Sequence, residues 1–259
     1  MVYRTLVVEP RDHSIVLTIN RPESRNAINP EVMREMIQAL DKARLDPDVR
    51  TVIVTGAGEK AFCAGGDLAG GSGGGALDQH FERALVSELF TTMRALGKPV
   101  IARVNGLALG GGFGLMLACD LVVAADTAEV GTPEVNIGLW PFIITAAIQR
   151  NLPPKIALEL MMLGKRVSAA EGLRWGFINR VVPATELDSA VAVLAGELAS
   201  KSPVVLRLGK DSFYAAEDLD FPSALKFLEA QLTIGLSAED ALEGVQAFIQ
   251  KRLPQWKGR

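Results

Sequence analysis

The stretch GLALGGGFG, at residues 106–114, decides both the fold and the expected site of this 259-residue chain. The run VIARV at residues 100–104 precedes it and predicts a buried strand, whereas LMLAC at residues 115–119 continues it as a helix. Glycines at the start of a helix leave backbone N–H groups uncovered at the positive end of the helix dipole. The stretch therefore predicts a binding place for an anion, or for an oxygen that becomes negative during a reaction.

Strands and helices alternate on both sides of this stretch. Runs of β-branched and apolar residues predict the strands, and the capping pair Asn29-Pro30 predicts the start of the first helix. The expected strands lie at residues 14–20, 50–55, 99–104 and 121–124, with a further helix from about Asp78 to Ala95. This alternation predicts right-handed crossovers and a largely parallel sheet.

The second half of the chain reads as nearly all helical from about Phe142 onward. Helix starts are expected at the capping box Ser168–Glu171 and at the similar pattern Ser237–Asp240. A short strand is expected around residues 180–182. The chain thus reads as an α/β core followed by a helical C-terminal part.

The composition is that of a globular protein, with 49% hydrophobic and 22% charged residues and a net charge of −3. No basic stripe stands out, which argues against nucleic acid as the main partner. Charges such as Arg4 and Glu9 interrupt the N-terminus, so no signal peptide is expected. Cys63 and Cys119 lie in apolar, glycine-containing surroundings and are expected to be reduced and buried. We expect a cytoplasmic protein.

The residues that carry chemistry are few. His13 and His80 are the only histidines, and neither they nor the cysteines have metal-ligand spacing. The glycine run at residues 70–75 reads as a surface loop, and its formal match to a dinucleotide fingerprint lacks the required preceding strand. Carboxylates and backbone N–H groups remain as the candidate catalytic groups.

Two glycine-rich turns each follow a strand, at residues 61–68 and 106–114. At the carboxyl ends of adjacent strands, two such turns can aim two N–H groups at one carbonyl oxygen. The alternative is that the glycines only permit close packing. Either turn alone fits that alternative, whereas the pair favours a functional site.

Several blocks of the sequence resemble the enoyl-CoA hydratase/isomerase family, the crotonases. The blocks lie in the family's order at residues 20–29, 61–68, 106–120, 133–139 and 247–252. The resemblance implies a spiral of β-β-α turns, with an α/β core over residues 1–198 and a helical trimerisation region over residues 199–259. It also implies a homotrimer or a dimer of trimers that acts on an acyl-CoA thioester in fatty-acid or related acyl-CoA metabolism. No separate cofactor, metal, membrane or nucleic acid is expected, because CoA is part of the substrate.

By position in the family's motifs, the catalytic groups are the N–H groups of Gly66 and Gly111, which hold the thioester oxygen, and the carboxyl group of Glu134. The resemblance, with the acyl-pocket reading of Trp140, implies substrate contacts for Arg25, Ala27, Ala64, Gly65, Asp67, Leu68, Gly114, Trp140, Phe248 and Lys251. Phe248 and Lys251 correspond to a pair that reaches CoA across a subunit boundary, and a solvated charge is an equal alternative for Lys251.

The chain departs from the family's hydratases at Gly114, where they usually carry a first glutamate; only the second, Glu134, is present. One carboxyl group suits a proton shuttle between C4 and C2, the 3-enoyl to 2-enoyl isomerisation, while the family as a whole favours hydration of 2-enoyl-CoA. Hydrolysis or C–C cleavage of acyl-CoA, or binding without catalysis, are alternatives. A second departure is the bulky run Trp140–Ile144, which either lines the acyl pocket or packs in the core.

Overall fold

Two sheets form the core of the chain, for which the computed structural model describes residues 3–67 and 75–259. Within these residues the larger sheet has six strands in the order β1-β2-β3-β5-β7-β10, and the smaller has four in the order β4-β6-β8-β9. Neighbouring strands are parallel except in the pairs β1/β2 and β8/β9. The α/β class and the largely parallel sheet are therefore confirmed.

The strands of the larger sheet are β1 (Leu6–Arg11), β2 (Ser14–Ile19), β3 (Thr51–Gly56), β5 (Val100–Val104), β7 (Leu121–Ala125) and β10 (Arg180–Val182). Those of the smaller sheet are β4 (Ala61–Cys63), β6 (Leu107–Leu109), β8 (Glu129–Gly131) and β9 (Arg166–Ser168). The α-helices are α1 (Pro30–Leu45), α2 (Ala76–Arg94), α3 (Gly111–Leu117), α4 (Phe142–Asn151), α5 (Pro154–Leu163), α6 (Ala169–Trp175), α7 (Leu187–Ala199), α8 (Pro203–Ala216), α9 (Phe221–Leu236) and α10 (Glu239–Ile249). A 3-10 helix, η2, covers Pro133–Ile137.

Two helix starts follow their predicted caps. The side chain of Asn29 accepts a hydrogen bond from the N–H of Val32 at 2.9 Å, and Pro30 is the first residue of α1. Ser168 and Glu171 form the reciprocal capping box of α6. Both starts could be predicted because the side chain of a capping residue accepts a hydrogen bond from a backbone N–H group that has no acceptor within the helix.

Helix α10 begins near the predicted place, but the predicted capping pattern at Ser237–Asp240 is wrong. Ala238 caps α10 without a side-chain hydrogen bond, and the hydroxyl of Ser237 donates to the carbonyl of Ile234. Asp240 is only 1% exposed, and its carboxylate accepts hydrogen bonds from the Ser202 hydroxyl and the Lys257 N–H. This aspartate therefore fixes the C-terminal tail to the start of α8 instead of capping its own helix.

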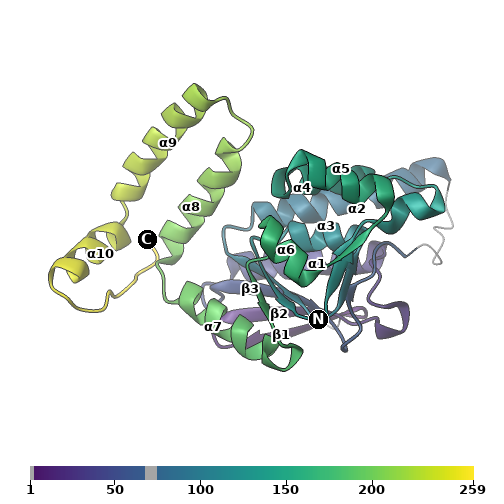
Figure 1. Ribbon diagram of the computed structural model, residues 1–259. Helices are drawn as coiled ribbons and strands as arrows, with labels where there is room; N and C mark the ends of the chain where they lie inside the picture. The colour runs from purple at the N-terminus through teal and green to yellow at the C-terminus, as the bar shows by residue number, and fades with distance from the viewer. Residues whose placement is uncertain (1–2, 68–74) are drawn as a thin grey trace.

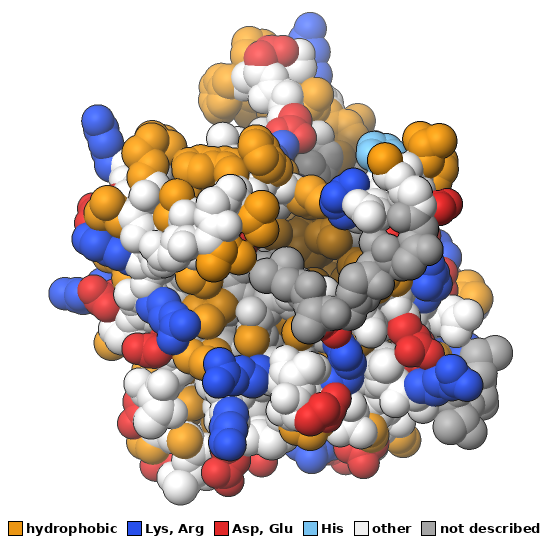
Figure 2. All heavy atoms as spheres, turned by 90° about the vertical axis from the view of Figure 1, so that its right-hand side faces the viewer, with side chains coloured by type: hydrophobic (Ala, Val, Ile, Leu, Met, Phe, Trp, Pro, Cys, Tyr) orange, Lys and Arg blue, Asp and Glu red, His pale blue; other side chains and the backbone are white. Residues whose placement is uncertain are grey.

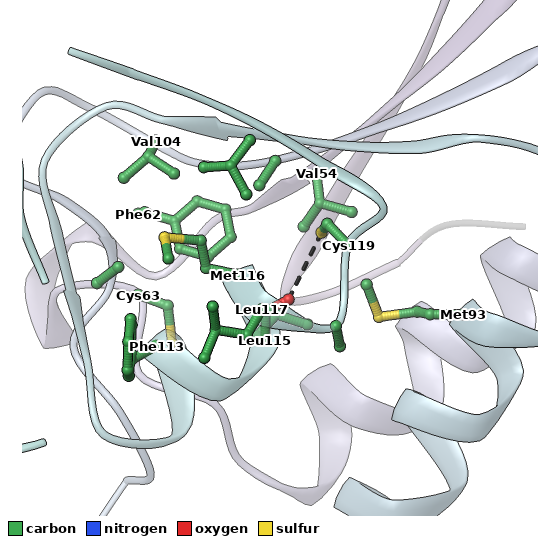
Figure 3. Close-up of a cluster of buried hydrophobic side chains, with 14 of the residues drawn as sticks. Val54, Phe62, Cys63, Met93, Val104, Phe113, Leu115, Met116, Leu117 and Cys119 are labelled. Atoms are coloured by element: carbon green, nitrogen blue, oxygen red, sulfur yellow. Dashed lines mark hydrogen bonds between the residues drawn. The ribbon is translucent and has the colours of Figure 1, made fainter. Parts of the chain in front are cut away.

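Helix α3, which carries the glycine-rich stretch, runs through the middle of the core (Figure 3). Phe113, Leu115 and Met116 are fully buried, and Phe113 meets Phe177 edge to face with ring centroids 5.6 Å apart. Cys63 packs on the same helix as a free, buried thiol, and burial raises its pKa to about 11. Buried side chains of the core therefore surround α3.

The C-terminal helices α8, α9 and α10 stand apart from the rest of the molecule (Figure 1). Helix α8 is attached to the core by Asp120, whose carboxylate accepts from the Lys210 ammonium and the Tyr214 hydroxyl, both at 2.7 Å. In the part of the chain described, no single helix is long and apolar enough to cross a membrane. Among the described helices, only one pair, residues 184–199 and 203–216, is long and apolar enough when the two helices are taken together, and this pair is bent.

Candidate active site

The N–H of Gly66 points away from Ile28 because of how its neighbours are bonded. Gly66 forms a parallel bridge with Ile28, in which the N–H of Ile28 donates to Gly65 O and the N–H of Asp67 donates to Ile28 O, both at 2.9 Å. In such a bridge the bonded groups belong to the residues on either side, so the N–H of Gly66 itself points away from Ile28. It is thereby left available to a ligand.

The N–H of Gly111 lies beside it. Strands β4 and β6 are parallel neighbours, so the turns that follow them meet at one edge of the smaller sheet. A Cβ atom placed on Gly111 would lie 3.4 Å from the Gly66 nitrogen, and one placed on Gly65 would lie 3.7 Å from the Gly111 nitrogen. Gly111 is the first residue of α3, where N–H groups have no acceptor within the helix. The two predicted donors are therefore adjacent.

Glu134 lies next to this pair of N–H groups. The N–H of Gly110 donates to Gly131 O at 2.9 Å, which ties the start of α3 to the end of β8, three residues before Glu134. The Glu134 Oε1 atom is 2.8 Å from the place that a Cβ on Gly110 would take. The turn of η2 is closed by the N–H groups of Gly138 and Leu139, which donate to Val135 O and Glu134 O. Backbone bonds therefore hold the carboxyl group in place.

The Glu134 side chain is half-buried. Its Oε2 atom is buried and has no hydrogen-bond partner among the described residues. Burial disfavours the charged form and raises the pKa of Glu134 above its ordinary value. A carboxyl group whose pKa is raised toward neutrality can both accept and return a proton, which is the property expected of a general acid/base.

The segment predicted to run along CoA is joined into one unit by Arg21. Its guanidinium donates to Ala27 O at 2.7 Å and to the Asp67 carboxylate at 2.8 Å. The N–H of Ala64 donates to Arg25 O at 3.1 Å, so Arg25, Ala27, Ala64, Gly65 and Asp67 are brought together beside Gly66. Leu68 and the glycine run at residues 70–74 lie outside the described residues.

The two C-terminal residues predicted at the site are not brought to it within one chain. Phe248 is 86% exposed on α10, and Lys251 is exposed just beyond the helix. Helix α10 lies at the far end of the molecule from α3 (Figure 1). Within one chain, these two residues therefore lie away from Gly66, Gly111 and Glu134.

The residues after η2 differ in burial. Trp140 is half-buried against the core, whereas Phe142 is 78% exposed at the start of α4. Ile144 is 4% exposed and fills the space beside Gly114: a Cβ on Gly114 would lie 2.7 Å from Ile144 Cβ and 3.2 Å from Phe90 Cζ. Core packing, one of the two predicted roles of the run Trp140–Ile144, is therefore what Ile144 does. The contact of Phe90 with Gly114 was not visible in the sequence, because Phe90 reaches α3 from another helix.

Among the described carboxylates that could replace the missing one, Glu82 is half-buried on α2. Asp67 is paired with Arg21, and Asp78 accepts from the N–H of Gly75 at the start of α2. In the described part of the chain, no group of three His, Cys, Asp or Glu side chains is placed to hold a metal ion. Viewed from the side where α2 begins, the surface is hollowed, and hydrophobic side chains lie in the depth of the hollow (Figure 2).

The chain is similar to known proteins over nearly its whole length. A family model described as enoyl-CoA hydratase/isomerase matches residues 11–259. Carnitinyl-CoA dehydratase of Proteus mirabilis is 39% identical over 264 residues, covering 99% of each chain, and that of Salmonella typhi is 40% identical over 248 residues, covering 94% of each. The crystal structure of an enoyl-CoA hydratase from Bacillus anthracis is similar with a TM-score of 0.94 and 32% identity, covering 99% of this chain and 100% of that one. The chain therefore belongs to the enoyl-CoA hydratase/isomerase family and has the crotonase fold.

Proposed function

We propose that this enzyme moves a proton at C2 of an acyl-CoA thioester through an enolate. In this proposal the N–H groups of Gly66 and Gly111 hold the thioester oxygen, and Glu134 is the acid/base. The observation that carries it is the half-buried carboxyl group of Glu134, which lies against Gly110 and has one buried oxygen without a partner among the described residues.

The two N–H groups act where charge develops. Removal of a C2 or C4 proton places negative charge on the thioester oxygen, and donors fixed by the backbone stabilise that charge more than the neutral ground state. The donors need no reorganisation because β4, β6 and α3 hold them in position. Each such donor is worth about 3 kcal/mol in other enzymes.

The reaction that the geometry supports best is isomerisation of a 3-enoyl-CoA to a 2-enoyl-CoA. The Glu134 carboxylate takes a proton from one end of the C2–C4 unit, the electron pair delocalises to the thioester oxygen, and the same carboxyl group returns the proton at the other end. No bond to water forms or breaks, so a single carboxyl group suffices.

Hydration of a 2-enoyl-CoA, or the reverse dehydration, is the second candidate. The similarity to carnitinyl-CoA dehydratases favours it. It requires a group that holds and deprotonates water in addition to Glu134, and Ile144 and Phe90 occupy the space at Gly114 where the family's hydratases usually carry their first glutamate. Isomerisation needs no such group.

A homotrimer, alone or as a dimer of trimers, is the proposed assembly. Family members are typically oligomeric. None of the residues of α9 is buried within the single chain, and Leu225, Leu232 and Leu236 are 53%, 62% and 61% exposed. Apolar surface of this extent on one helix is typical of a protein interface. An interface here would let Phe248 and Lys251 reach the CoA bound to a neighbouring copy.

The experiment offers 2-enoyl and 3-enoyl thioesters of several chain lengths to the purified enzyme in D2O and follows every product. The proposal predicts conversion of the 3-enoyl thioester with deuterium at C2 or C4, and a loss of about 10²–10⁴-fold in Glu134→Gln. Hydration as the faster reaction would favour the second candidate. Release of free CoA, or tight binding without turnover, would instead indicate hydrolysis, C–C cleavage or a non-catalytic acyl-CoA-binding protein.

A further inference from the structure

We propose that Asn26 is a positioning residue for the reaction: its buried carboxamide fixes the chain around β4 and so sets where the N–H of Gly66 lies relative to that of Gly111. The inference rests on the proposed function, because it takes these two N–H groups as the donors to the thioester oxygen. Asn26 acts through the backbone of Gly66 and not by touching the substrate.

Asn26 is buried and has an uncommon backbone conformation. Its φ is +57° and follows a φ of +53° at Arg25, whereas residues other than glycine seldom adopt a positive φ. Asparagine tolerates this left-handed conformation better than most residues do. The side chain is only 1% exposed. Such a conformation persists where the surrounding structure holds it, so the bonds around Asn26 show what it is held for.

The carboxamide of Asn26 bonds three backbone groups. Its Nδ2 atom donates to Ala57 O at 3.0 Å and to Ala61 O at 2.7 Å. Its Oδ1 atom accepts from the N–H of Arg21 at 3.1 Å. Ala57 follows the end of β3 and Ala61 begins β4. The side chain therefore holds the two ends of the β3–β4 turn together and ties them to the segment before α1.

The backbone on either side of Asn26 holds the other end of β4. The carbonyl of Arg25 accepts from the N–H of Ala64 at 3.1 Å, and Ile28 forms the parallel bridge with Gly66. One short segment thus contacts the chain from the start of β4 to Gly66, with the Asn26 side chain at one end and the Ile28 backbone at the other. A shift of either end moves the donor.

A second buried carboxamide ties the other donor to the same carbonyl. Asn105 is 8% exposed, and its Nδ2 atom contacts Ala61 O at 3.3 Å, the carbonyl that Asn26 also bonds. It bonds two further carbonyls, at the end of β3 and in the turn after it, at 2.9 and 2.6 Å. Asn105 shortly precedes β6, the strand that pairs with β4 and leads to Gly111. The two carboxamides therefore join both donor-bearing strands at Ala61 O.

This shared attachment matters because two donors must reach one oxygen. Donors to a developing oxyanion act at about 2.7–3.1 Å, and a misplacement of about 1 Å costs about 10²-fold in rate. The charge on the oxygen is greatest in the transition state, so a misplaced donor lowers kcat and leaves substrate binding nearly unchanged. A residue that only stabilised the fold would lower the melting temperature without this effect on kcat.

The first test compares two variants that each remove buried side-chain hydrogen bonds. Asn26→Gly keeps a residue that adopts a positive φ but removes the carboxamide, and is expected to lower kcat about 10²-fold with the Kd of a saturated acyl-CoA unchanged. Ser14→Ala is the matched control, because it removes the buried bond to Thr51, 2.5 Å long, at the opposite end of β3. It is expected to lower the melting temperature and to leave kcat unchanged.

The second readout is the C=O stretching frequency of a bound thioester labelled with ¹³C at C1, measured by infrared difference spectroscopy. Hydrogen bonds to the thioester oxygen lower this frequency whether or not turnover occurs. The parent enzyme and Ser14→Ala are expected to show the full decrease, and Asn26→Gly only part of it. Asn105→Ala, which frees the same carbonyl from the side of β6, is expected to lose part of the decrease as well.

The outcomes separate this inference from the proposed function. A parent enzyme that leaves the C=O frequency unchanged contradicts the proposed function itself. If the parent lowers the frequency and folded Asn26→Gly keeps both its kcat and the full decrease, the positioning role of Asn26 is overturned and the proposed function stands. If Asn26→Gly does not fold, Asn105→Ala decides: parent values in that variant overturn the shared attachment at Ala61 O.

Discussion

The carboxyl group of Glu134 rests against the backbone of Gly110, with Oε1 2.8 Å from the point where a Cβ on that residue would stand. Gly110 also has a φ of +53°, which L side chains rarely adopt. Position 110 therefore requires glycine for two reasons. Its backbone conformation disfavours other residues, and the carboxyl group of Glu134 occupies the space that a side chain would take.

Gly110→Ala is therefore expected to displace the Glu134 carboxyl group and lower kcat about 10²-fold, the effect of a misplacement of about 1 Å. Steady-state kinetics measure it, with circular dichroism to confirm folding. Gly176→Ala is the matched control: its φ is +87°, and a Cβ there meets no described atom within 4 Å. Equal losses in kcat for the two variants would mean that backbone strain alone, and not the contact with Glu134, limits position 110.

Glu134→Gln is expected to raise the melting temperature at neutral pH while it lowers turnover about 10²–10⁴-fold. Burial raises the pKa of Glu134, so the folded state binds its proton more tightly than the unfolded chain does. The cost of the ionised group is present above the raised pKa and disappears as the pH falls through it toward the ordinary value near 4.5. The difference in melting temperature between Glu134→Gln and the parent enzyme must therefore become smaller as the pH falls through this range.

Calorimetry at intervals of about one pH unit between about pH 4 and pH 8 measures this difference in melting temperature. Glu59→Gln, at an exposed turn residue, serves as the control and is expected to leave the melting temperature unchanged. In the parent enzyme, turnover that requires the carboxylate falls in the same window as the pH is lowered. A stability difference that is independent of pH would contradict the burial of an ionisable group at this position.

The N–H of Gly111 can be removed without removing the helix. Proline is favoured at the first position of a helix, which is where Gly111 lies in α3. Gly111→Pro is expected to lower kcat about 10²–10³-fold. Gly111→Ala adds a comparable first carbon, which meets Gly66 N and Ile28 Cδ1 at 3.4 Å, but keeps the N–H. If the two variants lose activity equally, crowding and not the lost donor explains the effect.

The apolar side of α9 is expected to be covered by other copies of the chain. The 27.7 kDa chain should sediment as a trimer or hexamer, and Leu232→Asp with Leu236→Asp should shift it toward the monomer. Lys226→Glu, an exposed polar change on the same helix, is expected to leave the assembly intact. A parent protein that sediments as a monomer would contradict the proposed route by which Phe248 and Lys251 reach CoA.

Much of the fold was predictable because its longer elements carry their own signals. The strands expected at residues 14–20 and 50–55 were found as β2 and β3 within one residue of each end, since long β-branched runs have a clear pattern. Strands β4, β6, β8 and β9 have three residues each, too few to show a period. The smaller sheet, which aligns the two glycine turns, was therefore not visible as a sheet.

The residues of the site also differ in whether the local sequence predicts them. Gly66, Gly111 and Glu134 lie in contiguous motifs, and the role of each was predicted from the family motif that it matches. Ile144 and Phe90 meet Gly114 only because α4 and α2 pack on α3, and packing between distant segments leaves no mark on local sequence. The glycine at position 114 indicates that a carboxylate is missing, but the local sequence does not indicate which side chains fill the space beside it. The division of the chain at residue 198 stays a prediction.

The central claim is that Glu134 moves a proton at C2 of an enolate held by Gly66 and Gly111. Exchange of the C2 hydrogen of an acyl-CoA thioester for deuterium, followed by NMR in D2O, tests it most directly, because exchange reports proton transfer whatever the later fate of the substrate. The account predicts exchange by the parent enzyme and a loss of about 10²–10⁴-fold in Glu134→Gln with thioester binding retained. Exchange at the parent rate in folded Glu134→Gln would contradict it.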